Sequence, residues 1–285
     1  HQKNILPVVD QALKKAKVRI DQLEAIAYTK GPGLLGSLLV GSSFAKGLAL
    51  SRALPLLEVN HMKAHILAHF IKDENQEPEF PFLCLTVSGG HTQIVKVKSH
   101  LEMEVLGATL DDAAGEAFDK AAKMMNIPYP GGPLIDKLAQ KGDENRFQFK
   151  VGKMEGYNFS FSGLKTGILY FLRAEVKKQP DFIEKNKADL CASIQKTIVD
   201  SLMLKLKEAV EDTGIKQVAL AGGVSANSKL RSTLLAQEQK GWKCYIPKFE
   251  YCTDNAAMIA IAGHYLLKAG EIAEEASAAE PRMKI

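Results

Sequence analysis

The sequence predicts an α/β protein with two lobes. Short apolar runs typical of strands alternate along the chain with longer segments of helical periodicity. The length of 285 residues is enough for two lobes or for one large α/β domain. Hydrophobic residues make up 46% of the chain and charged residues 25%, and no apolar run reaches the length of a membrane span. Composition therefore favours a globular protein over a membrane-embedded one.

The first part of the chain reads as helix, strand, helix, strand. Gly31-Pro32-Gly33 predicts a tight turn, and Asn60 is the expected N-cap of a helix that carries three histidines. The expected elements are an amphipathic helix over 4–17, a strand over 25–29, a long helix rich in small residues over 34–52 and a buried strand over 55–59.

The remainder predicts an antiparallel set of strands followed mainly by helices. The strands are expected over 82–88, 92–98 and 102–108. The pattern is helical from 112 to 139 with a break at 128–133, and polar and irregular over 142–160. The final elements are helices over 162–214, a buried strand over 218–222, a helix from Ser225, a short strand near Tyr245 and a last helix from about Asp254.

Charge and cysteine usage agree with a cytoplasmic protein. The net charge of +4 permits a polyanionic partner without demonstrating one. The chain begins without Met and almost at once enters helical periodicity, so we expect a fragment. Reduced thiols are expected, because no C-x-x-C pair occurs among the cysteines, which are Cys84, Cys191, Cys244 and Cys252.

The stretch VNHMKAHILAHF contains His61, His65 and His69, which share one face if they lie on a single helix. Imidazoles at i and i+4 can bind one divalent metal, as in the H-E-x-x-H motif. That motif needs a Glu after the first His as general base, and Met62 stands there, which disfavours a metalloprotease. Partly buried helix histidines are the simpler alternative until a third ligand is found. Asp254, in CTDNAAMIA, is either an N-cap or that ligand, completing a two-His, one-carboxylate site.

Three glycine pairs lie where strands end or helices begin. Ser88-Gly89-Gly90 follows an apolar strand, Gly131-Gly132 opens a helix, and Gly222-Gly223 follows the strand VALAG. Exposed backbone N–H groups at such places accept phosphates, although each pair alone is more often a plain turn. None matches G-x-G-x-x-G or the P-loop pattern. Three pairs in one chain favour a nucleotide site.

Three carboxylates, Asp112, Glu116 and Asp119, fall on one face of the helix predicted from residue 112. Lys120 and Lys123 follow, so a solvated charged face is one interpretation. The alternative is a carboxylate that binds ribose hydroxyls, because the small residues of DDAAGEAFDKAAK permit close approach.

Taken together, these motifs closely resemble those of the bacterial TsaD family, the tRNA N6-adenosine threonylcarbamoyltransferases, formerly labelled O-sialoglycoprotein endopeptidases. The matching segments run nearly end to end: YTKGPGLLGSLLVG, NHMKAH, TVSGGHTQ, DDAAGEAFDKAAK, YPGGP, FSFSGLKT, LAGGVSANSKLR and CTDNAAMIA. The family's additional N-terminal segment, with an acidic motif near the phosphates, is not in this sequence. Some archaeal relatives have a metal-binding Tyr where this chain has Thr86.

The resemblance implies an actin-like (ribonuclease H-like) two-lobed ATPase-type fold with the active site in the interlobe cleft. We accordingly expect an N-terminal lobe over 1–110 that carries the metal histidines. A C-terminal lobe over 111–285, with a helical insertion, would carry most of the nucleotide site. The helix 254–268 is expected to pack back on the N-terminal lobe.

The resemblance also implies the reaction: transfer of threonylcarbamoyl from threonylcarbamoyl-AMP to N6 of the adenosine next to the anticodon, in tRNAs that read codons starting with A. His61, His65 and Asp254 match the metal ligands, with Fe²⁺ favoured and Zn²⁺ possible, whereas His69 matches none. Partners would be tRNA and TsaB-type and TsaE-type proteins. The residues matching the adenylate site are Thr86, Val87, Ser88, Gly89, Gly90, Asp119, Gly132, Asp136 and Asn227.

Two further functions remain open from the sequence alone. One is a kinase or ATPase of the same fold, which would share the glycine turns but would not need the histidine pair. The other is a non-catalytic or truncated subunit that binds tRNA or a partner. His91, directly after the first glycine pair, is a candidate for proton transfer, with a structural role as its alternative.

Overall fold

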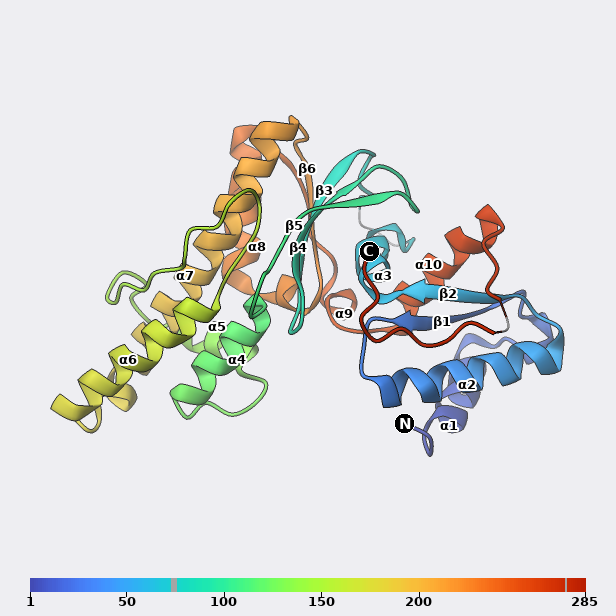
Figure 1. Ribbon diagram of the computed structural model, residues 1–285, viewed down its shortest axis with the longest axis horizontal. Coiled ribbons are helices and arrows are strands. Elements are labelled where there is room, and N and C mark those ends of the chain that lie inside the picture. The colour runs from blue at the N-terminus through green and yellow to red at the C-terminus, as the bar shows by residue number, and fades with distance from the viewer. Residues whose placement is uncertain (73–75, 275) are drawn as a thin grey trace. The chain divides into compact units, whose positions relative to one another are not determined.

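The computed structural model describes residues 1–72, 76–274 and 276–285, and the chain divides into two compact units (Figure 1). The first unit comprises residues 1–74, 100–103 and 254–285, and the second comprises residues 75–99 and 104–253. The boundary predicted after residue 110 does not coincide with this division. The strands before it join the second unit through pairing with a strand more than a hundred residues later, which local periodicity cannot reveal.

The first unit is built on two parallel strands, β1 and β2, in register from Ile26 opposite Leu56. Helices α2 and α10 pack on this small sheet, and α3 continues directly from β2. Gly263 of α10 lies so close to Ala27 that an added Cβ would come within 2.6 Å of the alanine Cβ. The elements are α1 (Ile5–Ala16), η1 (Ile20–Gln22), β1 (Ile26–Gly31), α2 (Leu35–Arg52), β2 (Leu56–Asn60), α3 (His61–Leu67), η2 (Ala68–Phe70) and α10 (Ala256–Ala269).

The C-terminal segment after α10 lies against the first turn and the second strand of this unit. The amide of Glu280 donates to Lys30 O at 2.8 Å, and an added Cβ on Gly31 would collide with the Glu280 carbonyl. The side-chain amide of Asn60 donates to Lys284 O at 2.8 Å. The segment is therefore tied to the residue that begins the histidine helix.

The second unit contains a five-stranded sheet in the order β5-β4-β3-β6-β7. Strand β3 is antiparallel to β4 and parallel to β6, and β7 is parallel to β6. Every residue of β3 is buried, as expected for a central strand covered on both faces. The strands are β3 (Phe82–Val87), β4 (Thr92–Val97), β5 (Met103–Ala108), β6 (Gln217–Ala221) and β7 (Lys243–Tyr245).

The helices of the second unit share one large core with the sheet. Leu83, Leu85 and Val87, alternate residues of β3, contribute to this core together with apolar residues of α4 to α8. Helices α4 to α7 gather on one side of the sheet (Figure 1). The elements are α4 (Ala114–Met124), α5 (Gly131–Ala139), α6 (Ser162–Lys178), α7 (Phe182–Thr213), η3 (Gly223–Ala226), α8 (Ser228–Leu235), η4 (Ala236–Lys240) and α9 (Phe249–Cys252). None of the described helices combines the length and the apolar character that crossing a membrane requires.

Candidate functional sites

The first candidate site, in the first unit, joins the start of α3 to the start of α10. Asn60 caps α3, because its Oδ1 accepts from Met62 N at 2.9 Å and from Lys63 N at 3.1 Å. This cap confirms the helix start that the sequence predicted. It fixes the first turn of α3, which carries His61 and His65.

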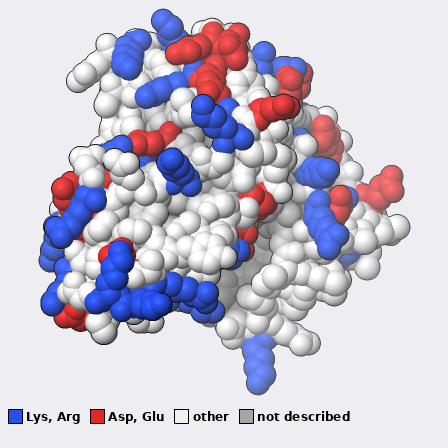
Figure 2. Space-filling model, turned by 60° about the vertical axis from the view of Figure 1, so that its left-hand side comes forward, with Lys and Arg blue, Asp and Glu red and all other residues white. Residues whose placement is uncertain are grey.

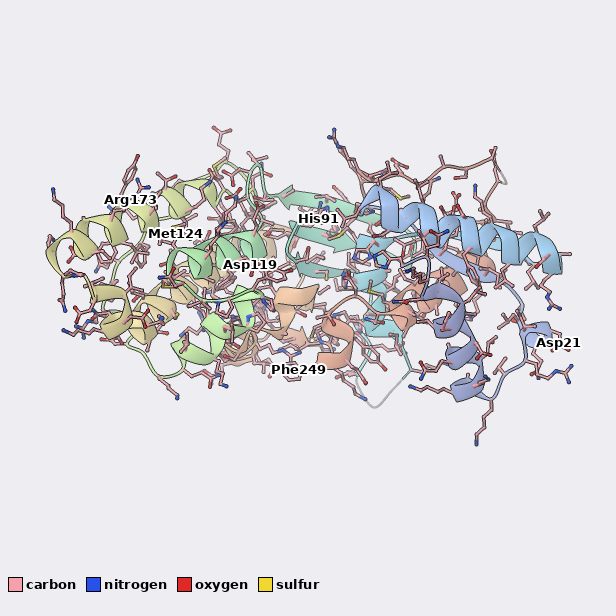
Figure 3. All side chains as sticks on the ribbon, turned by 90° about the horizontal axis from the view of Figure 1, so that it is seen from below. Asp21, His91, Asp119, Met124, Arg173 and Phe249 are labelled. Carbon is pink, nitrogen blue, oxygen red and sulfur yellow. The ribbon has the colours of Figure 1, made fainter. Side chains whose placement is uncertain are left out.

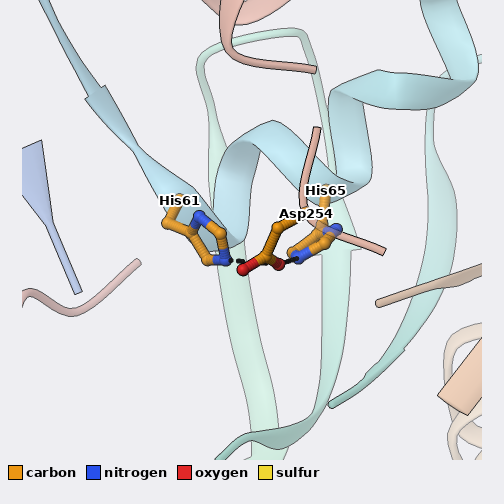
Figure 4. A group of neighbouring side chains, drawn as sticks. All are labelled: His61, His65 and Asp254. Carbon is orange, nitrogen blue, oxygen red and sulfur yellow. Dashed lines mark ion pairs between the residues drawn. The ribbon is translucent and has the colours of Figure 1, made fainter. Parts of the chain in front are cut away.

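Asp254 lies opposite the two imidazoles. Its Oδ1 is 3.2 Å from His61 Nε2 and 3.3 Å from His65 Nε2, and the two rings meet edge to face at 4.7 Å (Figure 4). The helix cap that the sequence left open for Asp254 is supplied instead by Asn255, which accepts from Met258 N at 2.8 Å. The Asp254 side chain is thereby left to face the histidines.

The electrostatics of this cluster suit a cation. Hydrogen bonds from His61 and then from His65 hold the pKa of the Asp254 carboxyl well below its usual range, although burial opposes the shift. The buried Nδ1 of His65 has no hydrogen-bond partner in the described part of the chain, so no protein acceptor there holds the ring in the tautomer that leaves Nε2 unprotonated for a metal.

The donor set and its spacing fit a divalent transition metal. One ligand atom from each of His61, His65 and Asp254 lies within 4.8 Å of the others. Among residues 1–72, 76–274 and 276–285, this is the one group of three or more such side chains found with that geometry. Two imidazoles and a carboxylate suit Fe²⁺ or Zn²⁺. His69 is buried in η2, beyond the end of α3, and is outside the group.

The second candidate site, in the second unit, begins with the turn after β3. Ser88 N donates to His91 O at 2.8 Å, and Ser88 Oγ accepts from His91 N at 3.1 Å, so residues 88–91 form a closed turn. Gly89 and Gly90 are exposed, and within the described residues their amides donate to no acceptor. The turn therefore presents two free N–H groups.

Thr86 and Val87, which the resemblance also assigns to the adenylate site, are completely buried in β3. Thr86 Oγ1 lies 3.7 Å from Cys84 Sγ. Any contact of these two residues with a ligand would have to use the backbone.

Two glycines allow other segments to approach this turn. Gly115, at the start of α4, donates its N–H to Ser88 O at 3.2 Å, and an added Cβ would lie 2.5 Å from that oxygen. Gly222, which follows β6, has a φ of +83° and would place a Cβ 2.5 Å from Val87 O. The glycine turns after the parallel strands β3 and β6 therefore meet at one edge of the sheet, as expected for a nucleotide site in an α/β fold.

The third glycine pair is held by Asp119 of α4, which Figure 3 labels. Asp119 Oδ1 accepts from Gly131 N at 2.8 Å and from Gly132 N at 3.3 Å. Of the three carboxylates on this helix face, Asp112 and Glu116 both bind Lys120 at 2.8 Å. The charged-face interpretation therefore describes those two, and Asp119 alone faces a glycine pair.

Asp136 and Asn227 come together at the start of α8. Asp136 accepts from Ser228 N at 3.0 Å and from Ser228 Oγ at 2.6 Å. Asn227 Oδ1 caps α8 by accepting from Leu230 N at 3.0 Å, and its Nδ2 donates to Gln195 at 2.8 Å. Both side chains already have protein partners, so they hold the turn after β6 in place.

The sequence reasoning missed Asp111. Its carboxylate accepts from the Oγ atoms of Ser160 and Ser162 and from the amides of Phe161 and Ser162, and so holds the start of α6 against the start of α4. The repeated serines of FSFSG were the available signal, because short hydroxyl side chains near a helix start commonly bind a carboxylate or cap the helix.

Comparison with solved structures defines the class of fold. T. kodakarensis HypF superimposes with a TM-score of 0.64 at 16% identity over 90% of this chain and 42% of its own. Component A of the (R)-2-hydroxyglutaryl-CoA dehydratase of Acidaminococcus fermentans gives a TM-score of 0.50 at 15% identity, over 90% of this chain and 80% of its own. The actin-like fold predicted from the sequence is confirmed by these neighbours.

Comparison of sequences identifies the family. Residues 1–261 match the family model of TsaD, tRNA N6-adenosine threonylcarbamoyltransferase. A curated relative of that name from Christiangramia forsetii is 59% identical over 100% of this chain and 84% of its own length. Another, from Thermosipho africanus, is 48% identical over 100% of this chain and 85% of its own. The chain belongs to the TsaD family.

Proposed function

We propose that this protein transfers a threonylcarbamoyl group to N6 of adenosine in tRNA. The observation that carries the proposal is the family match, which spans residues 1–261 and is supported by relatives aligned over the whole chain. We further propose that the donor is threonylcarbamoyl-AMP, that AMP is released and that the acceptor is the adenosine next to the anticodon in tRNAs reading codons that start with A. We also propose the cytoplasm as the place of the reaction, because the substrate is tRNA.

The reaction joins adenosine N6 to the carbamoyl carbon and breaks the bond between that carbon and the phosphate oxygen. AMP leaves with the electron pair of the broken bond, and N6 loses one proton. AMP is a good leaving group, so no nucleophile of the enzyme is needed. Because N6 is a weak nucleophile, positioning and electrostatics must supply most of the rate enhancement.

The turn after β3 is the proposed binding place of the adenylate phosphate. The free N–H groups of Gly89 and Gly90 would offset the charge that develops on the leaving phosphate. His91, at the end of the same turn, is the candidate to take the proton from N6. Asp119 has only one carboxylate oxygen engaged with the glycine pair in the described part of the chain, so the other is available to a ribose hydroxyl.

His61, His65 and Asp254 are the proposed ligands of one divalent metal, Fe²⁺ in the first place and Zn²⁺ in the second. The convergence of their donor atoms within 4.8 Å supports this assignment. When bound, the metal supplies a Lewis acid for an oxygen of the substrate. Met62 occupies the position at which a metalloprotease of the H-E-x-x-H type carries its general base, so peptide hydrolysis has no support at this site.

We propose that proteins of the TsaB type and the TsaE type are its partners. The test combines the protein with threonylcarbamoyl-AMP, tRNA and these two partner proteins. Nucleoside mass spectrometry of the digested tRNA should detect threonylcarbamoyladenosine. If threonylcarbamoyladenosine is absent although the protein binds AMP and the tRNA is intact, the proposed transfer is contradicted.

The metal assignment has its own control. His61→Ala should lose metal and activity together while the fold persists, whereas His69→Ala, which alters a buried histidine outside the group, should keep its metal. Metal analysis of the purified variants decides the question. Full occupancy in His61→Ala would overturn the ligand assignment without affecting the proposed reaction.

A further inference from the structure

Helix α6 begins inside the FSFSGLKT segment, whose serines bind Asp111, and it has two distinct faces. Leu164, Ile168 and Leu172, spaced four apart, are almost fully buried in the core of the second unit. The opposite face is exposed along its whole length, and its residues are Gly163, Thr166, Gly167, Tyr170, Arg173, Ala174 and Lys177.

The outer part of this face carries an aromatic ring and two cations. Tyr170 is 65% exposed, although tyrosine usually buries its ring, and its hydroxyl has no hydrogen-bond partner within the described residues. Arg173 and Lys177 follow at one-turn intervals and form no ion pair there, in contrast with Lys178, which binds Glu175 at 2.6 Å. The face therefore offers positive charge that the protein itself does not neutralise.

Helix α6 as a whole also carries an excess of positive charge. Its basic residues are Lys165, Arg173, Lys177 and Lys178, against the single acidic residue Glu175. The space-filling view that brings this side forward shows Lys and Arg side chains gathered toward its lower left, with few acidic ones among them (Figure 2), and Figure 3 labels Arg173 on α6. Such a face complements a polyanion.

The inner part of the face lacks large side chains. Gly163 and Gly167 have open space where a Cβ would be, so internal packing does not explain them. Glycine inside a helix is destabilising relative to alanine. A requirement for close approach by an external backbone would account for both glycines.

The beginning of α6 is joined by contacts to the proposed adenylate site in the same unit. Lys165 Nζ lies 3.9 Å from Asp112, whose neighbour Asp111 holds the first residues of the helix. Two residues beyond Asp112 begins α4, where Gly115 donates to Ser88 O of the glycine turn. The exposed face of α6 therefore starts beside the reaction site and leads away from it.

We propose that the exposed face of α6 binds the tRNA substrate. The small residues at its start admit the RNA backbone, Tyr170 stacks on an unpaired base, and Arg173 and Lys177 bind phosphates of the adjoining stem. From Gly163 to Lys177 the face is about 21 Å long at 1.5 Å per residue, which is enough to follow several phosphates. This inference rests on the proposed function, because it takes tRNA as the substrate.

The test compares three variants with the wild-type protein, each with the TsaB-type and TsaE-type partners present. Arg173→Glu/Lys177→Glu removes both cations, and Tyr170→Ala removes the ring. Lys216→Glu/Lys240→Glu is the matched control, because it makes the same change of net charge at two exposed lysines outside α6. Fluorescence anisotropy with labelled tRNA gives affinity at several salt concentrations, and calorimetry gives affinity for AMP.

The charge-reversal variant should bind tRNA at least tenfold more weakly. For this variant, the slope of log affinity against log salt concentration should be smaller in magnitude by about one to two. Tyr170→Ala should weaken tRNA binding about fivefold or more. AMP affinity should be unchanged in both, and the control should bind tRNA within about twofold of the wild type.

The proposal is overturned if the two α6 variants bind tRNA like the wild type, or if the wild type does not bind tRNA at all. It is also overturned if they bind tRNA normally but no longer associate with a partner protein, because the face would then be a protein interface. Failure of the proposed reaction is a separate outcome. In that case the wild type binds tRNA through α6, as the variants show, but forms no modified nucleoside.

Discussion

Asn60 offers the sharpest test of how the fold holds the proposed metal ligands. Its side chain makes two kinds of hydrogen bond: Oδ1 caps α3, and Nδ2 donates to Lys284 O in the C-terminal segment. Helix α3 has only seven residues, and a helix of that length is not stable by itself. The first turn, which carries His61 and His65, therefore depends on the cap and on packing.

The magnitude follows from those two contacts. Losing an Asn cap costs about 1 kcal/mol, and losing the bond to Lys284 O costs about 1 kcal/mol more. If the whole of this cost falls on the ligand geometry, Asn60→Ala weakens metal binding by about 30-fold, at 1.36 kcal/mol per factor of ten. Asn60→Ser keeps a capping oxygen and loses only the bond to the segment, so it should weaken binding about fivefold.

The assay is titration of chelator-stripped protein with Zn²⁺ in competition with a chromophoric chelator, and circular dichroism verifies the fold of each variant. The expected order of affinity is wild type, then Asn60→Ser, then Asn60→Ala. Equal affinity in all three would refute the claim that the cap positions the histidines. An Asn60→Ser protein as weak as Asn60→Ala would move the whole effect to the C-terminal segment.

Two further predictions concern the second unit. Asp119→Ala removes the acceptor of the Gly131 and Gly132 amides, so calorimetry should show AMP binding about tenfold more weakly, with the metal content of the protein unchanged. The control is Glu116→Ala, which lies on the same helix face but is paired with Lys120 and should leave the affinity for AMP unchanged. Burial of the Asp111 carboxyl opposes its ionisation, but hydrogen bonds from Ser160 and Ser162 outweigh burial and lower the pKa of the carboxyl. The ionised carboxylate therefore stabilises the fold at neutral pH, and this contribution is lost as the pH falls below about 4 and through the folded-state pKa. Asp111→Asn should therefore be about 1 kcal/mol less stable than wild type in urea unfolding at pH 7, with the gap closing in acid; an equal gap at both pH values would contradict this assignment.

Much of the local structure could be predicted because its signals are local. The cap at Asn60 and the turns at the glycine pairs depend on residues within a few positions of each other, and the structure has them where the sequence placed them. The break between α4 and α5 was likewise visible in PYPGGP. Such features follow from intrinsic conformational preferences, which survive the folding of the rest of the chain.

The grouping of strands could not be predicted in the same way. Pairing of β3 with β6 joins segments far apart in the sequence, and the hydrophobic pattern of β3 gives no indication of its partner. The predicted boundary after residue 110 therefore separates strands that the structure holds in one sheet. Long-range pairing becomes visible only in three dimensions.

The site residues divide along the same line. That His61 and His65 share a helix turn follows from their spacing, but the approach of Asp254 from the other end of the chain required either the structure or the family resemblance. The structural uses of Asp136 and Asn227 were not foreseen, because Ser228 and Gln195 bind them through tertiary contacts. A carboxylate or amide near a glycine pair does not reveal in sequence which of its atoms the fold already occupies.

The most direct test of the account is the fate of the carbamoyl carbon. Threonylcarbamoyl-AMP labelled with ¹³C at that carbon is incubated with the protein, its partner proteins and tRNA, and AMP and labelled nucleoside are quantified together. We predict one labelled N6-threonylcarbamoyladenosine in tRNA for each AMP released. Release of AMP with no label in the tRNA would show that the protein is a hydrolase. The absence of both products would show that this chain does not perform the family reaction. Either result would contradict the account.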